Sequence, residues 1–258
     1  MNRLGRLCLA AALLLAPLAA RAADTPAVAA ASDLSAALPE VASAFQKATG
    51  QTVKLTFGSS GNFAQQIQNG APYEVFLSAD ESYVQTLQAA GRTQGLGELY
   101  AVGRIGLFLP QGSPLKPDAT LKDLGAAAQD GRLRKFAIAN PDHAPYGRAA
   151  REALQSAGVW DAVQPKLVLG ENVSQATQFA TSGSAQGGVI PLSLAITPQV
   201  KAAGRFVPIS ADRHQPLRQR MVLLTGAGPT AQAFYRFLQG PQARAILARY
   251  GFTLPARR

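Results

Sequence analysis

The chain has 258 residues, with 25 lysines and arginines against 15 acidic residues, and a formal net charge of +10. This length suits one large domain or two smaller ones. The basic residues are scattered, apart from the segment 213–220 and the pair 257–258, and no stripe mixes basic with aromatic residues. The pattern therefore argues against nucleic-acid binding and favours a generally solvated basic surface.

Residues 1–23 have the pattern of a cleavable secretory signal peptide. Two arginines precede an apolar run over 7–18, and a small-x-small motif follows, so we expect cleavage after Ala22 or Ala23. The run is too short to span a bilayer. Cys8, the only cysteine, lies too early for a lipoprotein anchor and leaves with the signal. The mature protein is thus expected outside the cytoplasm, without disulfides, and with 22 basic and 15 acidic residues, a charge of +7.

Short strand-like runs alternate with amphipathic helical patterns through the mature chain. The expected strands are 53–57, 74–77, 105–109, 136–139, 166–169, 188–190, 205–209 and 221–225. The expected helices are 63–68, 81–90, 147–157, 173–181, 230–238 and 241–250. This alternation predicts an α/β fold with mostly parallel sheets flanked by helices. The late return of strands suggests two lobes that the backbone crosses more than once.

The stretch FGSSGN at 57–62 joins an expected strand to an expected helix and admits three interpretations. A serine-hydrolase elbow needs Gly-x-Ser-x-Gly, and from Gly58 the pattern places Ser60 correctly but has Asn62 in the last position. A base would have to be His143 or His214, the only histidines. Dinucleotide and Walker fingerprints are absent, and no cluster of cysteine, histidine and carboxylate residues suggests a metal site. An anion cradle and a simple helix cap remain open.

Four strand-to-helix turns share this character, and two fall in each half of the chain. They are 29–34, 57–62, 140–147 and 170–174. The first N–H groups of a helix have no partner within the helix and carry the positive end of its dipole. If the turns meet at the carboxyl ends of parallel strands, they form one anion-binding cleft. They could equally be four unrelated caps.

Four segments resemble the molybdate-binding receptors of bacterial ABC importers. They are AAASDLSAALPEVASAF (29–45), FGSSGNFAQQIQNGAPYEVFLSAD (57–80), IANPDHAPYGRAAREALQSAG (138–158) and FLQGPQARAILARYGF (237–252). The resemblance implies a two-lobed type II periplasmic-binding-protein fold with the ligand in the interlobe cleft. We expect lobe 1 to comprise 24–103 plus 206–258, and lobe 2 to comprise 104–205.

The resemblance also implies which residues contact the ligand. Carried over turn by turn, they are Ser32, Asp33, Ser59, Ser60, Tyr146 and, through its main-chain N–H, Val173. Two positions depart from the family pattern. Pro191 stands where some members have a tyrosine that donates a hydroxyl, and Tyr146 is expected to supply a phenolic donor instead. Asp33 replaces an asparagine, and we expect its side chain to cap a helix or point away from the ligand.

The resemblance implies a non-enzymatic, monomeric periplasmic receptor without a cofactor. It would bind molybdate, and tungstate with it, and deliver the anion to a membrane permease. A pocket of donors only would exclude protonated phosphate, whose O–H would lack an acceptor. Sulfate is not excluded by this reasoning, so a receptor for sulfate or another tetrahedral oxyanion is the alternative. A secreted serine hydrolase using Ser60 is a remote second alternative.

Overall fold

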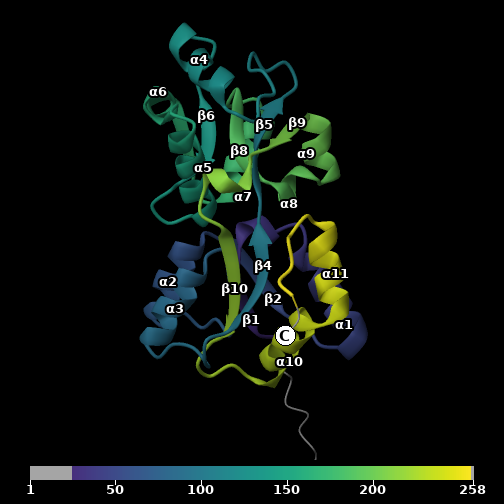
Figure 1. Cartoon of the computed structure of the whole chain (residues 1–258). Helices are drawn as coiled ribbons and strands as arrows, with labels where there is room; N and C mark the ends of the chain where they lie inside the picture. Colours follow the sequence, from purple (N-terminus) through teal and green to yellow (C-terminus); the bar gives the residue numbers. More distant parts are fainter. Residues whose placement is uncertain (1–24, 257–258) are drawn as a thin grey trace, which may run out of the picture.

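The computed structural model describes residues 25–256, which form two lobes that each contain a five-stranded sheet (Figure 1). The expected signal peptide 1–23, with Cys8, and the pair 257–258 lie outside the described residues. Within residues 25–256, no helix has the length and apolar character needed to cross a membrane.

The first lobe is built on the sheet β2-β1-β3-β10-β4. Its strands are β1 Ala27–Ala31, β2 Lys54–Gly58, β3 Val75–Ser78, β4 Glu98–Gly103 and β10 Leu217–Leu223. β1 runs parallel to β2 and β3, whereas β10 is antiparallel to both β3 and β4. Four strands therefore share one direction, and β10 alone is reversed.

Helices cover both faces of this sheet. They are η1 Ser32–Leu34, α1 Leu38–Thr49, α2 Ser60–Gln68, α3 Glu81–Ala89, α10 Pro229–Gln239 and α11 Pro241–Arg249. On the face of α1, α10 and α11, Phe45 packs edge-on against Phe234 with ring centroids 5.2 Å apart. On the face of α2 and α3, Phe63 packs against Phe76. Because side chains alternate along a strand, β1, β3 and β10 contribute residues to both cores.

The second lobe repeats this arrangement with the sheet β7-β6-β8-β5-β9. Its strands are β5 Ile105–Pro110, β6 Phe136–Ala139, β7 Leu167–Gly170, β8 Gly187–Pro191 and β9 Gly204–Pro208. Its helices are α4 Lys122–Asp130, α5 Pro145–Ser156, α6 Trp160–Val163, η2 Gln164–Lys166, α7 Val173–Thr181, α8 Leu192–Ala195, α9 Pro198–Ala203 and η3 Ala211–Arg213. β5 is antiparallel to both of its neighbours and is the reversed strand of this lobe.

The predicted α/β, two-lobed fold is confirmed, and each sheet is parallel except for one strand. The chain returns to the first lobe later than residue 206, where the sequence placed the boundary. β9 pairs with β5, and only β10, from Leu217, re-enters the first sheet. The strand expected at 221–225 is β10, which begins earlier, at Leu217. The sequence prediction began it too late because the polar residues Arg218, Gln219 and Arg220 hide its first half.

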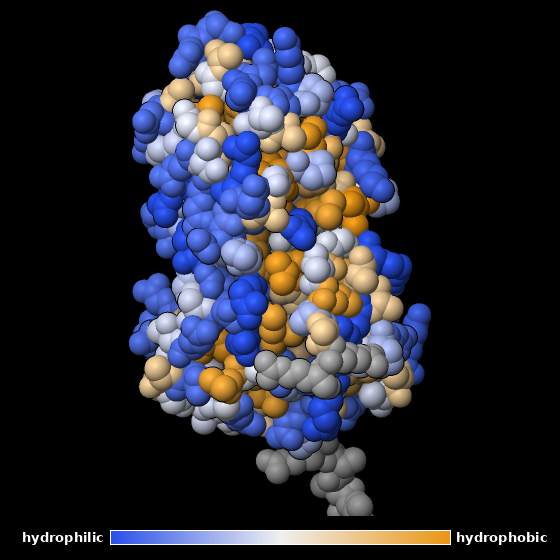
Figure 2. Space-filling model, in the orientation of Figure 1, coloured by the Kyte–Doolittle hydropathy of each residue, from blue (hydrophilic) through white to orange (hydrophobic). Residues whose placement is uncertain are grey.

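The surface is divided along the length of the molecule in Figure 2. Hydrophilic residues dominate the side that carries α2, α3 and α5, whereas hydrophobic residues gather along the middle of this face. The arrangement of both sheets is what positions the site, because β1 leads into η1, β2 into α2, β6 into α5 and β7 into α7.

Candidate oxyanion-binding site

A small cavity lies between the lobes, at the carboxyl ends of the parallel strands. It is lined by Ala31, Ser32, Asp33, Gly58, Ser59, Ser60, Ala79, Ala144, Pro145, Tyr146 and Val173. The empty space measures about 190 Å³ including its opening. All six residues that the sequence assigned to a ligand line this one cavity. Their role as anion ligands remains a prediction.

The first lobe contributes the turns after β1 and β2. Ser32 is almost fully buried, and within residues 25–256 its hydroxyl has no hydrogen-bond partner. Ser59 caps α2, with its Oγ accepting from the N–H of Asn62 at 3.4 Å. The Oγ of Ser60 accepts from the N–H of Ala79 at 3.0 Å, which ties α2 to the end of β3. Both serines thus serve the local structure while lining the cavity, so the cap and cradle interpretations are compatible.

The second lobe contributes the starts of α5 and α7. The side chain of Asn172 caps α7 and accepts from the N–H groups of Ser174 and Gln175, at 3.0 and 3.2 Å. The cap leaves the N–H of Val173, the first residue of the helix, at the cavity. α5 begins at Pro145 with no side-chain cap, so its first free N–H belongs to Tyr146. Each helix therefore presents a main-chain donor beside the positive end of its dipole.

Tyr146 does not offer its phenolic proton to the cavity as expected. Its hydroxyl donates to Oδ2 of Asp33 at 2.9 Å, and burial raises the pKa of the phenol well above its usual value. A phenol has one proton to donate, so the donor left to a ligand in the third turn is the N–H of Tyr146. Pro191, at the end of β8, donates nothing, but two residues later the Ser193 hydroxyl donates to the carbonyl of Asp33 at 2.7 Å.

Asp33 also departs from expectation, because its carboxyl caps no helix and the residue lines the cavity rather than pointing away from it. The side chain is fully buried. Its Oδ2 accepts from Tyr146 and from Nε2 of Gln219 at 2.6 Å, while Oδ1 is buried with no hydrogen-bond partner among the described residues. Burial raises the pKa of Asp33 from 3.8 to about 6, although the hydrogen bonds from Gln219 and Tyr146 lower it.

Sequence reasoning missed Gln219, which is completely buried in β10. One signal was available. In the run LRQRMVL, Leu217, Gln219 and Met221 alternate with arginines, so Gln219 occupies an inward position of the strand. A polar residue at such a position needs buried partners, and Gln219 finds them in Asp33 and Tyr100.

Neither histidine is placed as the base that a hydrolase with Ser60 as its nucleophile would need. Neither contacts Ser60: His214 bonds to the carbonyl of Gln215, and Nδ1 of His143 lies 2.9 Å from the hydroxyl of Ser59. On the other side of the imidazole, Oε2 of Glu171 lies 3.7 Å from Nε2 of His143. Among residues 25–256, no group of three or more histidine, cysteine or acidic side chains could hold a metal ion. None of the residues lining the cavity is lysine or arginine.

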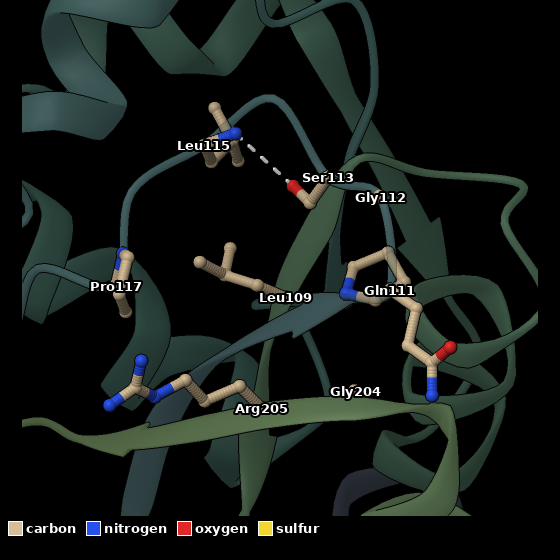
Figure 3. Close-up of a pocket in the computed structure, with 9 residues that line it drawn as sticks. Leu109, Gln111, Gly112, Ser113, Leu115, Pro117, Gly204 and Arg205 are labelled. Carbon is tan, nitrogen blue, oxygen red and sulfur yellow. Dashed lines mark hydrogen bonds between the residues drawn. The ribbon is translucent and has the colours of Figure 1, made fainter.

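A second hollow lies at the opposite end of the second lobe and is separate from this cavity. Figure 3 shows it between the end of β5, the following loop and the start of β9, with Leu109, Ser113 and Arg205 among its walls. Its empty space measures about 560 Å³ including its opening. The hollow contains none of the six predicted ligand residues, all of which line the interlobe cavity.

Comparison with known proteins places the chain in a family. Residues 26–253 match the family described as bacterial extracellular solute-binding protein. The chain is 38% identical to the molybdate-binding protein ModA of Azotobacter vinelandii, over 97% of this chain and 98% of that protein. It is 40% identical to ModA of Rhodobacter capsulatus, over 83% of this chain and 82% of that protein.

A solved structure supports the same assignment. The periplasmic molybdate-binding protein of Azotobacter vinelandii superposes with a TM-score of 0.79 and 32% identity, covering 90% of this chain and all of that one. The resemblance found in the sequence is therefore confirmed over nearly the whole described chain. The chain belongs to the bacterial extracellular solute-binding protein family, together with these molybdate-binding proteins.

Proposed function

We propose that this protein is a periplasmic receptor that binds molybdate, and tungstate with it, and delivers the anion to the permease of an ABC importer. The observation that carries the proposal is the convergence of the starts of η1, α2, α5 and α7, two from each lobe, on one cavity without lysine or arginine. The names of the relatives support the choice of anion. The receptor acts as a monomer, without catalysis or a cofactor.

Uncharged donors can hold a dianion in such a cavity. A hydrogen bond to a charged oxygen is about twice as strong as a neutral one, and these donors are fixed by helices before the ligand arrives. The free hydroxyl of Ser32 and the N–H groups of Tyr146 and Val173 can donate without breaking a bond within the protein. The Ser60 hydroxyl accepts from the backbone, which leaves its proton for the ligand. The Ser59 proton is free for the ligand when Nδ1 of His143 is the donor in the contact between these two side chains.

The test is calorimetric titration of the mature protein with molybdate, tungstate, sulfate and phosphate. We expect tight binding of the first two and weak binding of the others. Sulfate binding as tight as molybdate binding would replace the proposal by a general oxyanion receptor. Absence of binding by all four anions would overturn the proposal itself.

Ser32→Ala is the cleanest test of the site, because the Ser32 hydroxyl has no partner within the described chain. Loss of one hydrogen bond to a charged group costs about 1.5–3 kcal/mol, or roughly a tenfold to hundredfold weaker molybdate affinity. Ser182→Ala is the matched control, since Ser182 bonds only within an exposed turn near Ser184. Equal affinities for the two variants would remove Ser32 from the site.

Ester hydrolysis is a second candidate function, because Ser59, His143 and Glu171 follow one another in the order of a catalytic triad. The carboxylate of a working triad is buried and bonded to the imidazole, whereas Glu171 is 59% exposed and 3.7 Å away. We expect no ester hydrolysis by the protein. Turnover that Ser59→Ala abolishes would favour the hydrolase instead.

A further inference from the structure

The carboxyl of Asp33 is an acid at the centre of a site for anions. It lines the cavity, is fully buried, and has Oδ2 occupied by Tyr146 and Gln219. Oδ1 is buried and unpartnered among the described residues. A buried acceptor without a donor is costly, and an ionised one more so. The N–H groups of Asp33 and Leu34 approach the carboxyl and lower its pKa, but neither makes a hydrogen bond to Oδ1. This oxygen therefore still lacks a donor among the described residues.

The surroundings offer no charge to compensate an ionised Asp33. The titratable groups that face it are Tyr146 of α5 and Tyr100 of β4, and burial keeps both phenols neutral. Gln219 of β10 and Ser193 of α8 contribute neutral hydrogen bonds, and the backbone N–H groups of Asp33 and Leu34 lie nearby. α7 and the turn after β2 contribute Val173, Gly58 and serines, and no lysine or arginine lines the cavity.

Two negative charges in one cavity of this size would repel strongly, because the interior screens charge far less than water does. A proton between the carboxyl and the anion removes the conflict. It gives Oδ1 a bonding role and turns Asp33 from a repelling group into a donor.

We propose that the bound state holds one proton between Oδ1 of Asp33 and an oxygen of the oxyanion, so that capture of each dianion takes up one proton from solvent. This inference rests on the proposed function. Burial raises the pKa of Asp33 to about 6, so the free protein is mostly ionised at this carboxyl at about pH 8. A nearby dianion raises this pKa further and draws the proton in.

The inference changes the expected selectivity of the site. A cavity that contains a proton-accepting oxygen is not lined by donors alone, so the O–H of hydrogenphosphate would find a partner at Oδ1. Beside an ionised Asp33, however, hydrogenphosphate would bring one more negative charge into the cavity than molybdate with the shared proton does. Rejection of phosphate would then depend on charge and size rather than on an unpaired O–H.

The experiment counts protons during titration with molybdate. Calorimetry in two buffers with different ionisation heats, such as Tris and HEPES, at about pH 8, gives the number of protons taken up per anion. We expect about one for the wild type and about none for Asp33→Asn, which keeps the shape of the side chain and provides an amide donor. Between about pH 7 and 8.5, wild-type affinity should fall nearly tenfold per pH unit more steeply than that of Asp33→Asn.

His143, whose Nδ1 lies 2.9 Å from the Ser59 hydroxyl, is a side chain near the cavity that can accept a proton, and it supplies the second control. His143→Gln should still take up the proton. If Asp33→Asn does not fold, the wild type and His143→Gln decide the question between them: uptake by both supports Asp33, and uptake lost in His143→Gln overturns the proposal. Equal uptake by the wild type and Asp33→Asn also overturns it. Molybdate binding without uptake defeats this inference alone, whereas absence of binding defeats the proposed function as well.

Discussion

Asp33 connects the anion cavity to a chain of buried polar side chains behind it. Tyr100 donates to Oε1 of Gln219 at 2.7 Å, and Nε2 of Gln219 donates to Asp33 at 2.6 Å. Tyr146 completes the cluster from the second lobe. Gly103 makes room for the Tyr146 hydroxyl, because a Cβ at position 103 would lie 2.2 Å from that oxygen. The cluster joins both lobes at their hinge strands, and its only acid is Asp33.

The raised pKa of Asp33 predicts a pH-dependent stability. Because the folded-state value, about 6, exceeds 3.8, the folded protein holds a proton that the unfolded chain releases between these two pH values. Stability from this group is complete below about pH 4 and is lost as pH rises through about 6. Asp33→Asn should avoid that loss, so its free energy of unfolding relative to wild type should rise by roughly 3 kcal/mol between about pH 4 and 7.

Urea unfolding of the anion-free protein at several pH values measures this difference. Glu98→Gln is a suitable control, since Glu98 is exposed at the start of β4. Its stability relative to wild type should change little with pH. A constant difference between Asp33→Asn and wild type across the range would show that Asp33 is ionised in the folded protein throughout.

Tyr146→Phe and Tyr100→Phe test the same cluster from its two ends. The first removes a donor to the carboxyl of Asp33, and the second removes a donor to the neutral amide of Gln219. A bond to a charged group is worth about 1.5–3 kcal/mol, against about 1 for a neutral one. Tyr146→Phe should therefore destabilise more at pH 8 than at pH 5, whereas Tyr100→Phe should show one loss at both. Chemical denaturation at the two pH values distinguishes them, and equal pH dependence would contradict the assignment.

At the scale of secondary structure, the site depends on how each helix begins. α2 and α7 have side-chain caps from Ser59 and Asn172, whereas α5 begins at Pro145 without one. Close packing holds α5 in place instead: a Cβ on Gly147 would lie 2.2 Å from the carbonyl oxygen of Ala139 in β6. A side chain there would push the helix start, with the N–H of Tyr146, away from the cavity.

Asn172→Ala should weaken both the fold and the anion site. Loss of the cap removes the acceptor of two N–H groups and costs about 1 kcal/mol of stability. The loosened first turn would also hold the N–H of Val173 less firmly, so molybdate affinity should fall several-fold. Asp118→Ala removes a comparable acceptor from the N–H groups of Thr120 and Asp123, near the start of α4. It should lower stability without changing molybdate affinity. A loss of affinity in Asp118→Ala would mean that general destabilisation explains the weaker binding of both variants.

The elements that the sequence predicted are those with strong periodicity. The helix expected at 147–157 is α5, Pro145–Ser156, and the strand expected at 136–139 is β6. Weakly patterned elements were missed. β1, with the sequence AVAAA, has one β-branched residue, and its small side chains are explained only by helices packed on both faces.

The site was predictable in part for a similar reason. Turns rich in serine, glycine and asparagine indicate helix starts, so the residues that line the cavity could be proposed from the sequence. The partners of their side chains could not. Tyr146 reaches Asp33 across 113 positions of sequence and Gln219 reaches it across 186. The first contact depends on the relative placement of the lobes and the second on the strand order of the first sheet. Local patterns carry no information about either.

At the scale of the whole molecule, the chain crosses between the lobes after β4 and again before β10. In each lobe, the strand that follows a crossing, β5 or β10, is the reversed one. The reversal places the crossing segments beside the cavity while the other strands point their carboxyl ends toward it. Hinge motion at these segments would therefore open and close the site directly.

Two hydroxyls of the second lobe bind the first lobe beside the cavity. Ser174 donates to the carbonyl of Ser32 at 2.9 Å, and Ser193 donates to that of Asp33 at 2.7 Å. Neither side chain lines the cavity. Both bonds exist only when the lobes are together, so they stabilise the closed arrangement without being needed to fold either lobe.

The double variant Ser174→Ala/Ser193→Ala should therefore weaken anion binding through closure alone. Two neutral hydrogen bonds are worth about 2 kcal/mol, which corresponds to roughly thirtyfold weaker molybdate affinity if closure accompanies binding. The loss should appear mainly as faster dissociation, because the hydroxyls act after the anion has entered. Stopped-flow release of molybdate measures this rate, with Ser182→Ala as the control outside the interface. Dissociation at the wild-type rate would mean that the two lobes stay together whether or not the anion is bound.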